Sequence, residues 1–339
     1  MKILLYARDY ETVKQSGVGK AIDHQKKALS RVGCDFTTDE AEDFDLVHIN
    51  TVFPDSVRFA RKAHRMGKKV VYHAHSTKED FKNSFIFSNQ LAPLFKRWLI
   101  HCYKQGDVVL TPTTYSRGIL STYGLDRPIK VVSNGIDLSF WRARGGERSA
   151  FYKRYALDPS KKSILSVGLP IKRKGMDDFI ALAQRMPQYE FVWFGKLDRA
   201  LMSPEIKRML EEKTPNLHCP GYISSDLLRE AYCGADLYTF LTREETEGIV
   251  LLEALACRSP ILVRDIPIFE EDYQAGVQLY KGRSVDDFEE KIKAILEGRA
   301  PSLTEAGYQV AASKSIEETG HRLVQIYEAL LKKNESGRS

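Results

Sequence analysis

Residues 237–263 read LYTFLTREETEGIVLLEALACRSPILV. The short apolar runs Leu237–Phe240 and Pro260–Val263 are typical of buried strands, and the run Ile249–Ala256 between them predicts a helix. A strand, a helix and a second strand in this order form a unit whose two strands are parallel and whose helix covers one face of the sheet. This stretch therefore predicts an α/β fold.

The same alternation of strands and helices extends along the whole chain. The strands expected in the first half are Ile3–Tyr6, Leu46–Ile49, Val70–Tyr72, Val108–Leu110 and Lys130–Val132. Those expected in the second half, besides the two above, are Ser163–Val167 and Glu190–Phe194. Helical patterns include Ala21–Val32, Asp55–Met66, Asp177–Arg185 and Pro204–Glu212. Two such series predict two doubly wound, Rossmann-like domains.

The length of 339 residues also suits two domains, at roughly 100–200 residues each. The strand–helix pattern is interrupted near Arg142–Lys162, where Gly145 and Gly146 precede a charged helix. We therefore expect domains at 1–150 and 151–315. We further expect a closing helix with a short tail at 316–339, because Ile316–Lys332 carries apolar residues at helical spacing.

Composition excludes several classes of protein. No stretch approaches the roughly 20 apolar residues that span a bilayer, and the first apolar run ends in charged residues too early for a signal peptide. The five cysteines form no CxxC pair, so we expect reduced thiols rather than disulfides or a zinc site. These features predict a protein that stays in the cytoplasm.

Positive charge is concentrated in one part of the chain. Residues 58–104 contain eleven Lys and Arg but only two acidic residues, whereas the whole chain has a net charge of +6. This concentration indicates an anionic surface as partner. Because the basic residues accompany no recognised nucleic-acid module, we do not expect nucleic-acid binding.

The segment between strand and helix in residues 237–263 carries two carboxylates that suggest a ligand site. Glu245 lies in the expected loop, and Glu253 lies about two turns later on the expected helix. Between them, the N–H groups of Gly248, Ile249 and Val250 at the helix start form an anion pocket. Carboxylates for sugar hydroxyls beside amides for phosphate suit a nucleotide-sugar. An ordinary acidic helix start would explain one glutamate but not the second.

Two other segments follow expected strands. Gly17 and Gly19 lie between the first strand and a helix, where glycines allow either close approach to a ligand or a tight turn. Lys172, Arg173 and Lys174 follow the strand Ser163–Val167 and could pair with a diphosphate, although a lone basic run is more often a solvated turn.

Two further motifs resemble metal sites but do not complete one. His73 and His75 follow a strand and point to the same side, yet no third ligand is spaced to join them. For either histidine alone, a structural role is as well supported as a role in the cleft. Asp43 and Asp45 form a DxD pattern that opens a strand, which we interpret as structural. We therefore expect no metal.

A basic, aromatic-rich segment follows these motifs. Its expected membrane- or acceptor-facing residues are Phe85, Phe87, Phe95, Lys96, Arg97 and Trp98. Aromatic and basic residues on one amphipathic helix predict interfacial binding to anionic lipid. The alternative is that the same apolar residues pack on the sheet of the first domain.

Taken together in chain order, these motifs resemble the family 4 retaining glycosyltransferases of GT-B fold, in which two Rossmann-like domains face each other across a cleft. The motifs that carry the resemblance are Gly17–Gly19, His75, Asn134-Gly135-Ile136-Asp137, Arg173-Lys174-Gly175 and the pair Glu245 and Glu253. Within that family, residues 74–81, 83–91, 133–137 and 243–250 are similar to bacterial diglycosyldiacylglycerol synthases. Those enzymes add a second hexose to monoglucosyldiacylglycerol at the membrane surface.

The resemblance implies roles for the donor-binding residues. Arg173 and Lys174 would bind the donor pyrophosphate, and Gly17 and Gly19 would be donor-binding residues. Glu253 would bind the donor ribose, and Glu245 would contact hydroxyls of the transferred sugar. One departure from the family is Leu169, which follows Gly168 where many members carry an arginine.

The resemblance also implies a catalytic group and a reaction. His75 would be the active-site histidine near the C6 hydroxyl, with His73 as the alternative, so the expected catalytic residues are His75, Glu245 and Lys174. The reaction would be transfer of glucose or galactose from a UDP-hexose to monoglucosyldiacylglycerol, with retention and an α-linkage. No metal or other cofactor would be required.

The same resemblance implies a peripheral protein on the cytoplasmic side of the cell membrane, with an anionic lipid surface and a glycolipid acceptor as partners. Two alternatives remain open from the sequence. One is a family 4 transferase acting on a capsular, teichoic or other polysaccharide. The other is a nucleotide-sugar 2-epimerase, which needs no acceptor and which the basic amphipathic segment does not favour.

Overall fold

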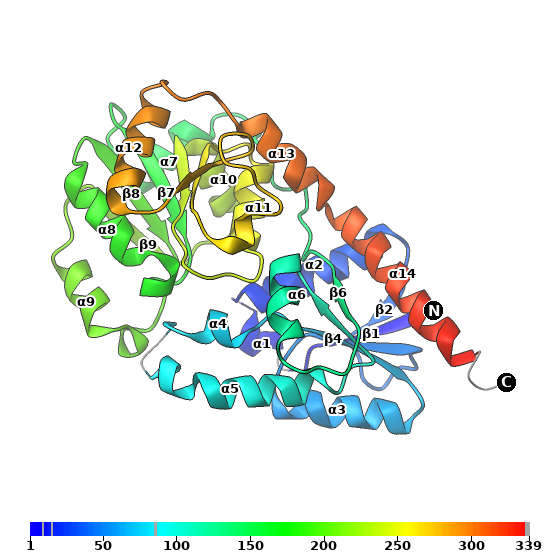
Figure 1. The fold of residues 1–339 in the computed structure, drawn as a ribbon. Coiled ribbons are helices and arrows are strands. Elements are labelled where there is room, and N and C mark those ends of the chain that lie inside the picture. Colours follow the sequence, from blue (N-terminus) through cyan, green and yellow to red (C-terminus); the bar gives the residue numbers. More distant parts are fainter. Residues whose placement is uncertain (9, 15, 85–86, 336–339) are drawn as a thin grey trace. The chain divides into compact units, whose positions relative to one another are not determined.

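A six-stranded parallel sheet lies at the core of each of two units of the chain (Figure 1). The computed structural model describes residues 1–8, 10–14, 16–84 and 87–335. Unit 1 comprises Met1–Glu79, Leu91–Asp137 and Lys314–Ser339, and unit 2 comprises Asp80–Gln90 and Leu138–Ser313.

The sheet of unit 1 has the strand order β2-β1-β3-β4-β5-β6. Its strands are β1 (Lys2–Tyr6), β2 (Asp35–Thr37), β3 (Leu46–Ile49), β4 (Lys69–His73), β5 (Val108–Thr111) and β6 (Ile129–Val131). Every residue of β3 and β5 is buried, because helices cover both faces of a parallel sheet. This double burial explains why the strands read as continuous apolar runs rather than as alternating patterns.

Helices from both ends of the chain belong to unit 1. They are α1 (Tyr10–Val13), α2 (Gly17–Arg31), α3 (Pro54–Arg65), α5 (Ser88–Tyr103), α6 (Thr114–Ser121) and α14 (Ile316–Glu335). Helix α4 (Lys78–Phe81) passes from unit 1 into unit 2 after Glu79, and α5 enters unit 1 at Leu91. Helix α14 packs closely against α2, because a Cβ at Gly320 would lie only 2.5 Å from the carbonyl oxygen of Ala28. Residues Leu323 and Tyr327 of α14 are fully buried in the core of unit 1.

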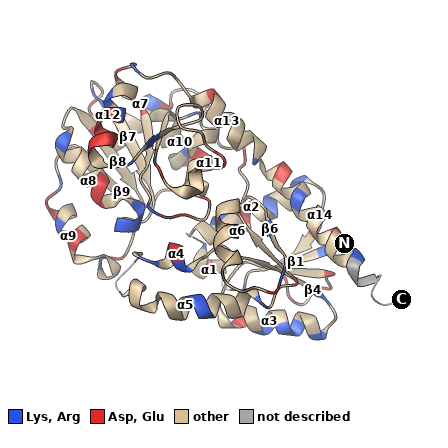
Figure 2. Cartoon of the chain, in the orientation of Figure 1, with Lys and Arg blue, Asp and Glu red and all other residues tan. Residues whose placement is uncertain are grey.

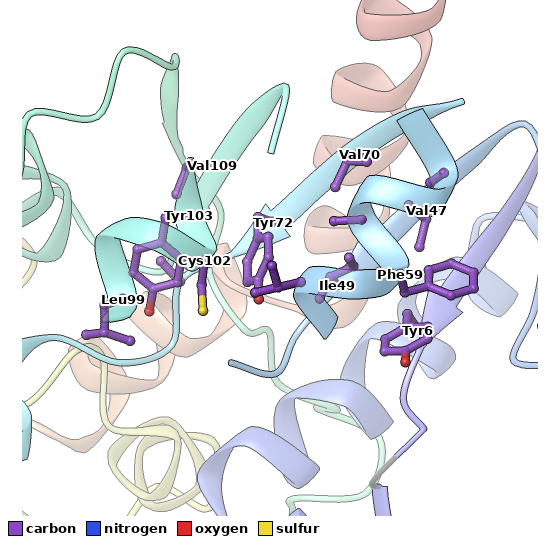
Figure 3. Close-up of a cluster of buried hydrophobic side chains, with 14 of the residues drawn as sticks. Tyr6, Val47, Ile49, Phe59, Val70, Tyr72, Leu99, Cys102, Tyr103 and Val109 are labelled. Carbon is purple, nitrogen blue, oxygen red and sulfur yellow. The ribbon is translucent and has the colours of Figure 1, made fainter. Parts of the chain in front are cut away.

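Two apolar clusters fill unit 1, and Figure 3 shows part of one of them. In that cluster the rings of Tyr6 and Phe59 stack with their centroids 4.4 Å apart. Tyr72 and Tyr103 meet edge to face at 5.6 Å, next to the buried Leu99. Burying each such side chain stabilises the fold by about 1.5–3 kcal/mol, so this cluster fixes α3 and α5 against the sheet.

The sheet of unit 2 has the strand order β12-β11-β10-β7-β8-β9. Its strands are β7 (Lys162–Val167), β8 (Tyr189–Phe194), β9 (Leu217–Gly221), β10 (Leu237–Phe240), β11 (Ile261–Arg264) and β12 (Tyr280–Gly282). Its α-helices are α7 (Glu147–Tyr155), α8 (Met176–Arg185), α9 (Pro204–Glu211), α10 (Ser225–Gly234), α11 (Ile249–Ala256), α12 (Val285–Leu296) and α13 (Thr304–Ser313). Three short 3₁₀ turns are η1 (Lys172–Lys174), η2 (Arg199–Leu201) and η3 (Pro267–Phe269).

The predicted α/β class and the two doubly wound sheets are confirmed. All the strands that the sequence predicts are present, with ends shifted by a residue in places. The strands β2, β9 and β12 were not predicted. Each lies at the edge of its sheet and has partly exposed residues, so it lacks the continuous apolar run that marks a central strand.

The division into units differs from the predicted domain limits. The chain passes from unit 1 to unit 2 after Asp137, ahead of residue 150, and α7 lies in unit 2 because it packs against α10. Helix α14 lies in unit 1 rather than forming a separate closing element. The segment Asp80–Gln90 belongs to unit 2 by its contacts, which the sequence did not indicate.

Candidate active site

In unit 2, the two segments that the sequence assigned to a donor lie side by side. The turn η1 follows β7, and the loop before α11 follows β10, and these two strands are neighbours in the sheet. The backbone N–H of Arg243 donates to the carbonyl oxygen of Arg173 at 2.8 Å, which joins the two segments directly. Ligands of open α/β sheets bind at such carboxyl ends of strands.

Lys174 and Glu245 form an ion pair between these segments. Both side chains are largely withdrawn from solvent, with exposed fractions of 16% for Lys174 and 8% for Glu245. Charges held this far from water interact more strongly than a surface pair. The structure thus brings together two of the three residues that were predicted to be catalytic.

Arg173 is bound by the protein itself. Its guanidinium lies 2.7 Å from Asp80 and donates to Ser84 Oγ and to the carbonyl oxygen of Glu244, both at 2.9 Å. Burial raises the pKa of Asp80, while the attraction of Arg173 opposes this effect. Arg173, which was predicted to bind a diphosphate, therefore anchors the segment Asp80–Gln90 to the loop that carries Glu245.

Helix α11 presents an unusual start and a buried carboxylate. Gly248 precedes the helix with φ at 83°, a left-handed conformation that favours glycine, and no side chain of the described residues caps this end. The amides of Gly248, Ile249 and Val250 thus lie at a helix N-terminus suited to an anion. Glu253, about one turn along the helix, is fully buried and accepts a hydrogen bond from the Tyr232 hydroxyl at 3.2 Å.

The loop before α11 is held by an ion-pair network that the sequence did not reveal. Arg243 pairs with Asp177 at 2.7 Å and with Asp178 at 2.6 Å, and Arg264 also pairs with Asp178. Two acidic residues in the first turn of α8 are common at helix starts, so they gave no signal of this role. The network fixes the backbone on which Glu245 stands.

In unit 1, His75 follows β4 and lies beside His73. The two rings are nearly parallel with centroids 4.1 Å apart, so the predicted orientation of both side chains to one side is confirmed. Nε2 of His75 lies 2.8 Å from Oδ1 of Asn50. Burial lowers the pKa of His75 to about 3, so the ring is neutral near pH 7.

His75 and Asn50 line a pocket of about 60 Å³ within the described part of unit 1. The lining residues are Val13, Val18, Asn50, Thr51, Val52, Phe53, His75 and Ser76. Four of these residues are apolar and four are polar, and an apolar wall with a few polar groups is typical of small-molecule sites. The pocket is small, and it places the imidazole of His75 at an accessible surface of unit 1.

Gly19 follows the lining residue Val18 and lies at a close approach of two backbone segments. A Cβ at Gly19 would lie 2.4 Å from the carbonyl oxygen of Val13, whereas one at Gly17 would meet no atom within 4 Å. The N–H of Gly19 donates to the side chain of Ser16, which caps α2. The need for glycine at position 19 thus follows from the packing of the turn, while donor binding by Gly17 and Gly19 stays a prediction.

The Asn-Gly-Ile-Asp motif is tied to α2 of unit 1. Nδ1 of His24 donates to the carbonyl oxygen of Gly135 at 2.7 Å, and Lys27 lies 3.3 Å from Asp137. Gly135 has φ at 78°, and its backbone approaches Thr319 of α14. The motif therefore joins α2, the loop after β6 and α14.

The predicted membrane-facing residues divide into two groups. Phe87 is 68% exposed, Leu91 and Leu94 of α5 are 45% and 59% exposed, and Arg97 is also exposed. Phe85 lies outside the described residues. Figure 2 shows basic residues along both α3 and α5. Exposed apolar residues next to an exposed basic residue are typical of a segment that binds a membrane interface.

The other predicted residues are engaged with unit 1. Phe95 and Trp98 are partly buried against the core, and Nε1 of Trp98 donates to the carbonyl oxygen of Val52 at 2.7 Å. The ammonium of Lys96 lies 4.4 Å from the centre of the Tyr123 ring. For these three residues, packing on the first domain describes the contacts that the structure shows.

No group of three or more His, Cys, Asp or Glu side chains in residues 1–8, 10–14, 16–84 and 87–335 is arranged to hold a metal ion. None of the helices described in the structure combines the length and the hydropathy of a bilayer-spanning segment.

The sequence matches two families and several characterised proteins. Residues 38–140 match Glycosyltransferase Family 4, and residues 147–311 match Glycosyl transferases group 1. The chain is 37% identical over 333 residues to the processive diacylglycerol alpha-glucosyltransferase of Acholeplasma laidlawii, which covers 98% of this chain and 99% of that protein. It is 27% identical to the alpha-galactosylglucosyldiacylglycerol synthase of Streptococcus pneumoniae, with coverage of 94% and 86%.

Solved structures share the fold at low sequence identity. HepE of Anabaena, solved in complex with UDP and glucose, has a TM-score of 0.79 and 14% identity, with 97% of this chain and 100% of that chain covered. The sucrose-phosphate synthase of Thermosynechococcus elongatus has a TM-score of 0.72 and 15% identity, with coverage of 96% and 80%. These likenesses confirm the predicted GT-B class of α/β fold with two Rossmann-like domains.

Proposed function

We propose that the chain transfers a hexose from a UDP-sugar to monoglucosyldiacylglycerol. The chain belongs to the glycosyltransferases that combine a Glycosyltransferase Family 4 domain with a Glycosyl transferases group 1 domain. The product would be an α-linked diglycosyldiacylglycerol. The observation that carries this proposal is the 37% identity, over nearly the whole chain, to a diacylglycerol glucosyltransferase. Since the name of that relative specifies diacylglycerol, diacylglycerol itself is the acceptor to compare with its monoglucosyl derivative.

We propose that unit 2 holds the donor. The two phosphates would be bound by the ammonium of Lys174 and by the amides of Gly248, Ile249 and Val250. Each of these groups can donate a hydrogen bond to an anion. On binding, the diphosphate would replace Glu245 as the ion-pair partner of Lys174. The carboxylate of Glu245 would then accept hydrogen bonds from hydroxyls of the sugar. The buried Glu253 would bind the ribose.

The proposed chemistry is a substitution on one face of the sugar. The acceptor oxygen would bond to C1 as the bond from C1 to the phosphate oxygen breaks, and the acceptor proton would pass to the departing phosphate. Lys174 and the start of α11 would stabilise the charge that develops on the diphosphate, which is the largest contribution that such groups make. With this charge neutralised by the protein, the reaction would need no metal and no cofactor besides the donor.

His75 would act from unit 1. Because its ring is neutral, it would orient a hydroxyl of the donor sugar by a hydrogen bond instead of adding a positive charge. The pocket beside it would take part of the sugar or of the acceptor headgroup. This role for His75, and those for Gly17, Gly19 and Arg173 in donor binding, are proposals.

We further propose that the protein binds the cytoplasmic face of the membrane peripherally. The support is the exposed apolar set Phe87, Leu91 and Leu94, which lies next to Arg97, and the basic face of α3. Apolar side chains would enter the headgroup region, while the basic residues would attract anionic lipids.

A transfer assay tests the proposed function. The full chain would be incubated with mixed micelles of an anionic phospholipid containing monoglucosyldiacylglycerol or diacylglycerol, with radiolabelled UDP-glucose or UDP-galactose. A labelled glycolipid whose glycosidic bond is cleaved by an α-glycosidase is expected. Release of UDP with label only on a polysaccharide acceptor would contradict the lipid acceptor, and conversion of the UDP-sugar without any acceptor would support an epimerase.

A further inference from the structure

Five buried polar side chains of unit 1 and the half-buried His75 form one hydrogen-bonded network. They come from α2, β3, the residue after β3, β4 with the residues after it, and α14, and they are Gln25, His48, Asn50, His73, His75 and Tyr327. A buried polar group costs free energy unless it has a hydrogen-bond partner. In a network of this size, each atom is therefore restricted to acting as donor or as acceptor.

The two amides of the network fix each other. Nε2 of Gln25 donates to Oδ1 of Asn50, and Nδ2 of Asn50 donates to Oε1 of Gln25, both at 2.8 Å. The second hydrogen on Nε2 of Gln25 faces Nδ1 of His73 at 3.0 Å, so that ring nitrogen accepts. Asn50 and Gln25 are 2% and 1% exposed, which leaves their amides little freedom to rotate.

The histidine at the other side of Asn50 then has one possible role for each nitrogen. Nε2 of His75 lies 2.8 Å from Oδ1 of Asn50, and a carbonyl oxygen can only accept. Nε2 therefore carries the proton. Because burial keeps the ring of His75 neutral, its Nδ1 bears the lone pair and accepts. The ring of His73, stacked at 4.1 Å, restricts rotation of His75 away from this arrangement.

We propose that Asn50 is a positioning residue that fixes the tautomer of His75, and that Gln25 holds Asn50 in the required orientation. This inference rests on the proposed function and deepens it. His75 presents an acceptor nitrogen, and so it selects a substrate group that donates, such as a hexose hydroxyl. Asn50 also lines the same pocket as His75, which places the pair at one surface.

Nuclear magnetic resonance tests the tautomer without any substrate. The full chain would be labelled with ¹⁵N-histidine, and long-range ¹H–¹⁵N spectra would be recorded at pH 7.5, with the signals of His75 assigned among the eight histidines by a His75→Gln variant. We expect the wild-type ring to be protonated at Nε2, and Asn50→Leu to show Nδ1–H or a mixture. The matched control is Tyr327→Phe, which removes the hydroxyl 2.6 Å from His48 and should leave the tautomer of His75 unchanged.

A wild-type ring protonated at Nδ1, which reversal of both amides would produce, overturns the proposal. So does an unchanged Nε2–H tautomer in a folded Asn50→Leu protein. A wild-type Nδ1–H signal overturns the proposal without any variant, which matters because replacement of a buried amide can prevent folding. Failure of the transfer assay would leave this result intact, so the proposed function and the role of Asn50 can fail separately.

Asn50→Asp provides the catalytic readout. A carboxylate at this position favours the imidazolium, whose Nδ1 donates, so activity should be lost as pH falls. The titratable groups facing His75 are His73 and, behind it, His48, and burial lowers the pKa of both. We expect kcat/KM of the variant to fall about tenfold from pH 8 to pH 6 beyond any change in the wild type. An Asn50→Asp pH profile identical to that of Tyr327→Phe would overturn the proposal.

Discussion

Arg173 and Asp80 form an ion pair at 2.7 Å although they lie in separate parts of the sequence, on the turn after β7 and in helix α4. The same guanidinium also donates to the carbonyl oxygen of Glu244, the residue before Glu245. The segment that leads into the basic helix α5 is thus attached, through one arginine, to the loop of the proposed donor site.

This attachment can be tested by local proteolysis. Asp80→Asn removes the charge partner of a buried guanidinium, which costs about 3 kcal/mol where both groups are shielded from water. We expect trypsin to cleave after Lys82 at least about tenfold faster in the variant. Asp126→Asn, which affects an exposed pair with Lys104, is the control and should match the wild type. Equal cleavage rates in all three proteins would mean that Arg173 does not hold the segment.

Lys174→Ala and Glu245→Ala should each lower kcat/KM by about a hundredfold or more, because each removes a group proposed to contact the diphosphate or the sugar. The folded state should persist, as judged by circular dichroism. Lys172→Ala is the matched control, since the side chain of the adjacent Lys172 pairs with the half-exposed Glu205. Activity near that of the wild type in either first variant would remove that residue from the proposed site.

Gly19→Ala and Gly17→Ala should differ sharply. The new methyl group of Gly19→Ala would lie 2.4 Å from the carbonyl oxygen of Val13, and overpacking of this kind costs about 1–3 kcal/mol. Gly17→Ala meets no atom within 4 Å and should keep the melting temperature of the wild type. Differential scanning calorimetry measures both effects. If Gly17→Ala is stable but has a raised KM for the UDP-sugar, donor binding by this segment is supported.

The buried histidines predict a loss of stability in acid. Burial lowers the pKa of His48 and of His75 to about 3, below the unfolded value near 6.5. Between these values the unfolded chain binds more protons, so stability falls as pH falls below about 6.5, by up to 1.4 kcal/mol per pH unit for each histidine. Hydrogen exchange protection factors of β3 and β4 at pH 7 and pH 5 measure this change. His48→Asn should flatten the dependence, whereas replacement of the exposed His101 by Gln should not.

The exposed apolar residues of the α5 segment predict membrane binding. A Leu91→Ser and Leu94→Ser double variant should bind vesicles containing anionic phospholipid at least about tenfold more weakly in a sedimentation assay, because two apolar side chains no longer enter the interface. Leu201→Ser changes a comparably exposed leucine of unit 2 and is the control. Added salt should weaken binding of the wild type as well, because the basic residues act through screened charge. Vesicle binding equal to the control would assign the apolar residues another role.

Much of this arrangement could be predicted from local sequence. The central strands were visible because burial on both faces demands unbroken apolar runs, and the loop with Glu245 and the turn with Lys174 were each found by their chemistry. Their contact follows once β7 and β10 are known to be neighbours.

The partners of these residues could not be predicted in the same way. Asn50 and Gln25 are ordinary polar residues without a motif, and their contacts join distant segments. Asp80 and Ser84 lie in segments that carry the family resemblance, but no role was assigned to them, and their contacts with Arg173 also join distant segments. The tautomer of a histidine depends on such contacts rather than on its neighbours in the chain. Edge strands are hard to predict for a related reason, since partial exposure removes the apolar signal.

The placement of α14 in unit 1 has a consequence for synthesis on the ribosome. Leu323 and Tyr327 complete the core of unit 1, yet they are translated after all of unit 2. Residues 138–313 can therefore emerge and fold while one apolar face of the first sheet is covered by α2 but not yet by α14. During that interval the nascent chain exposes a sticky surface, which chaperones recognise, until the residues of α14 leave the exit tunnel and close it.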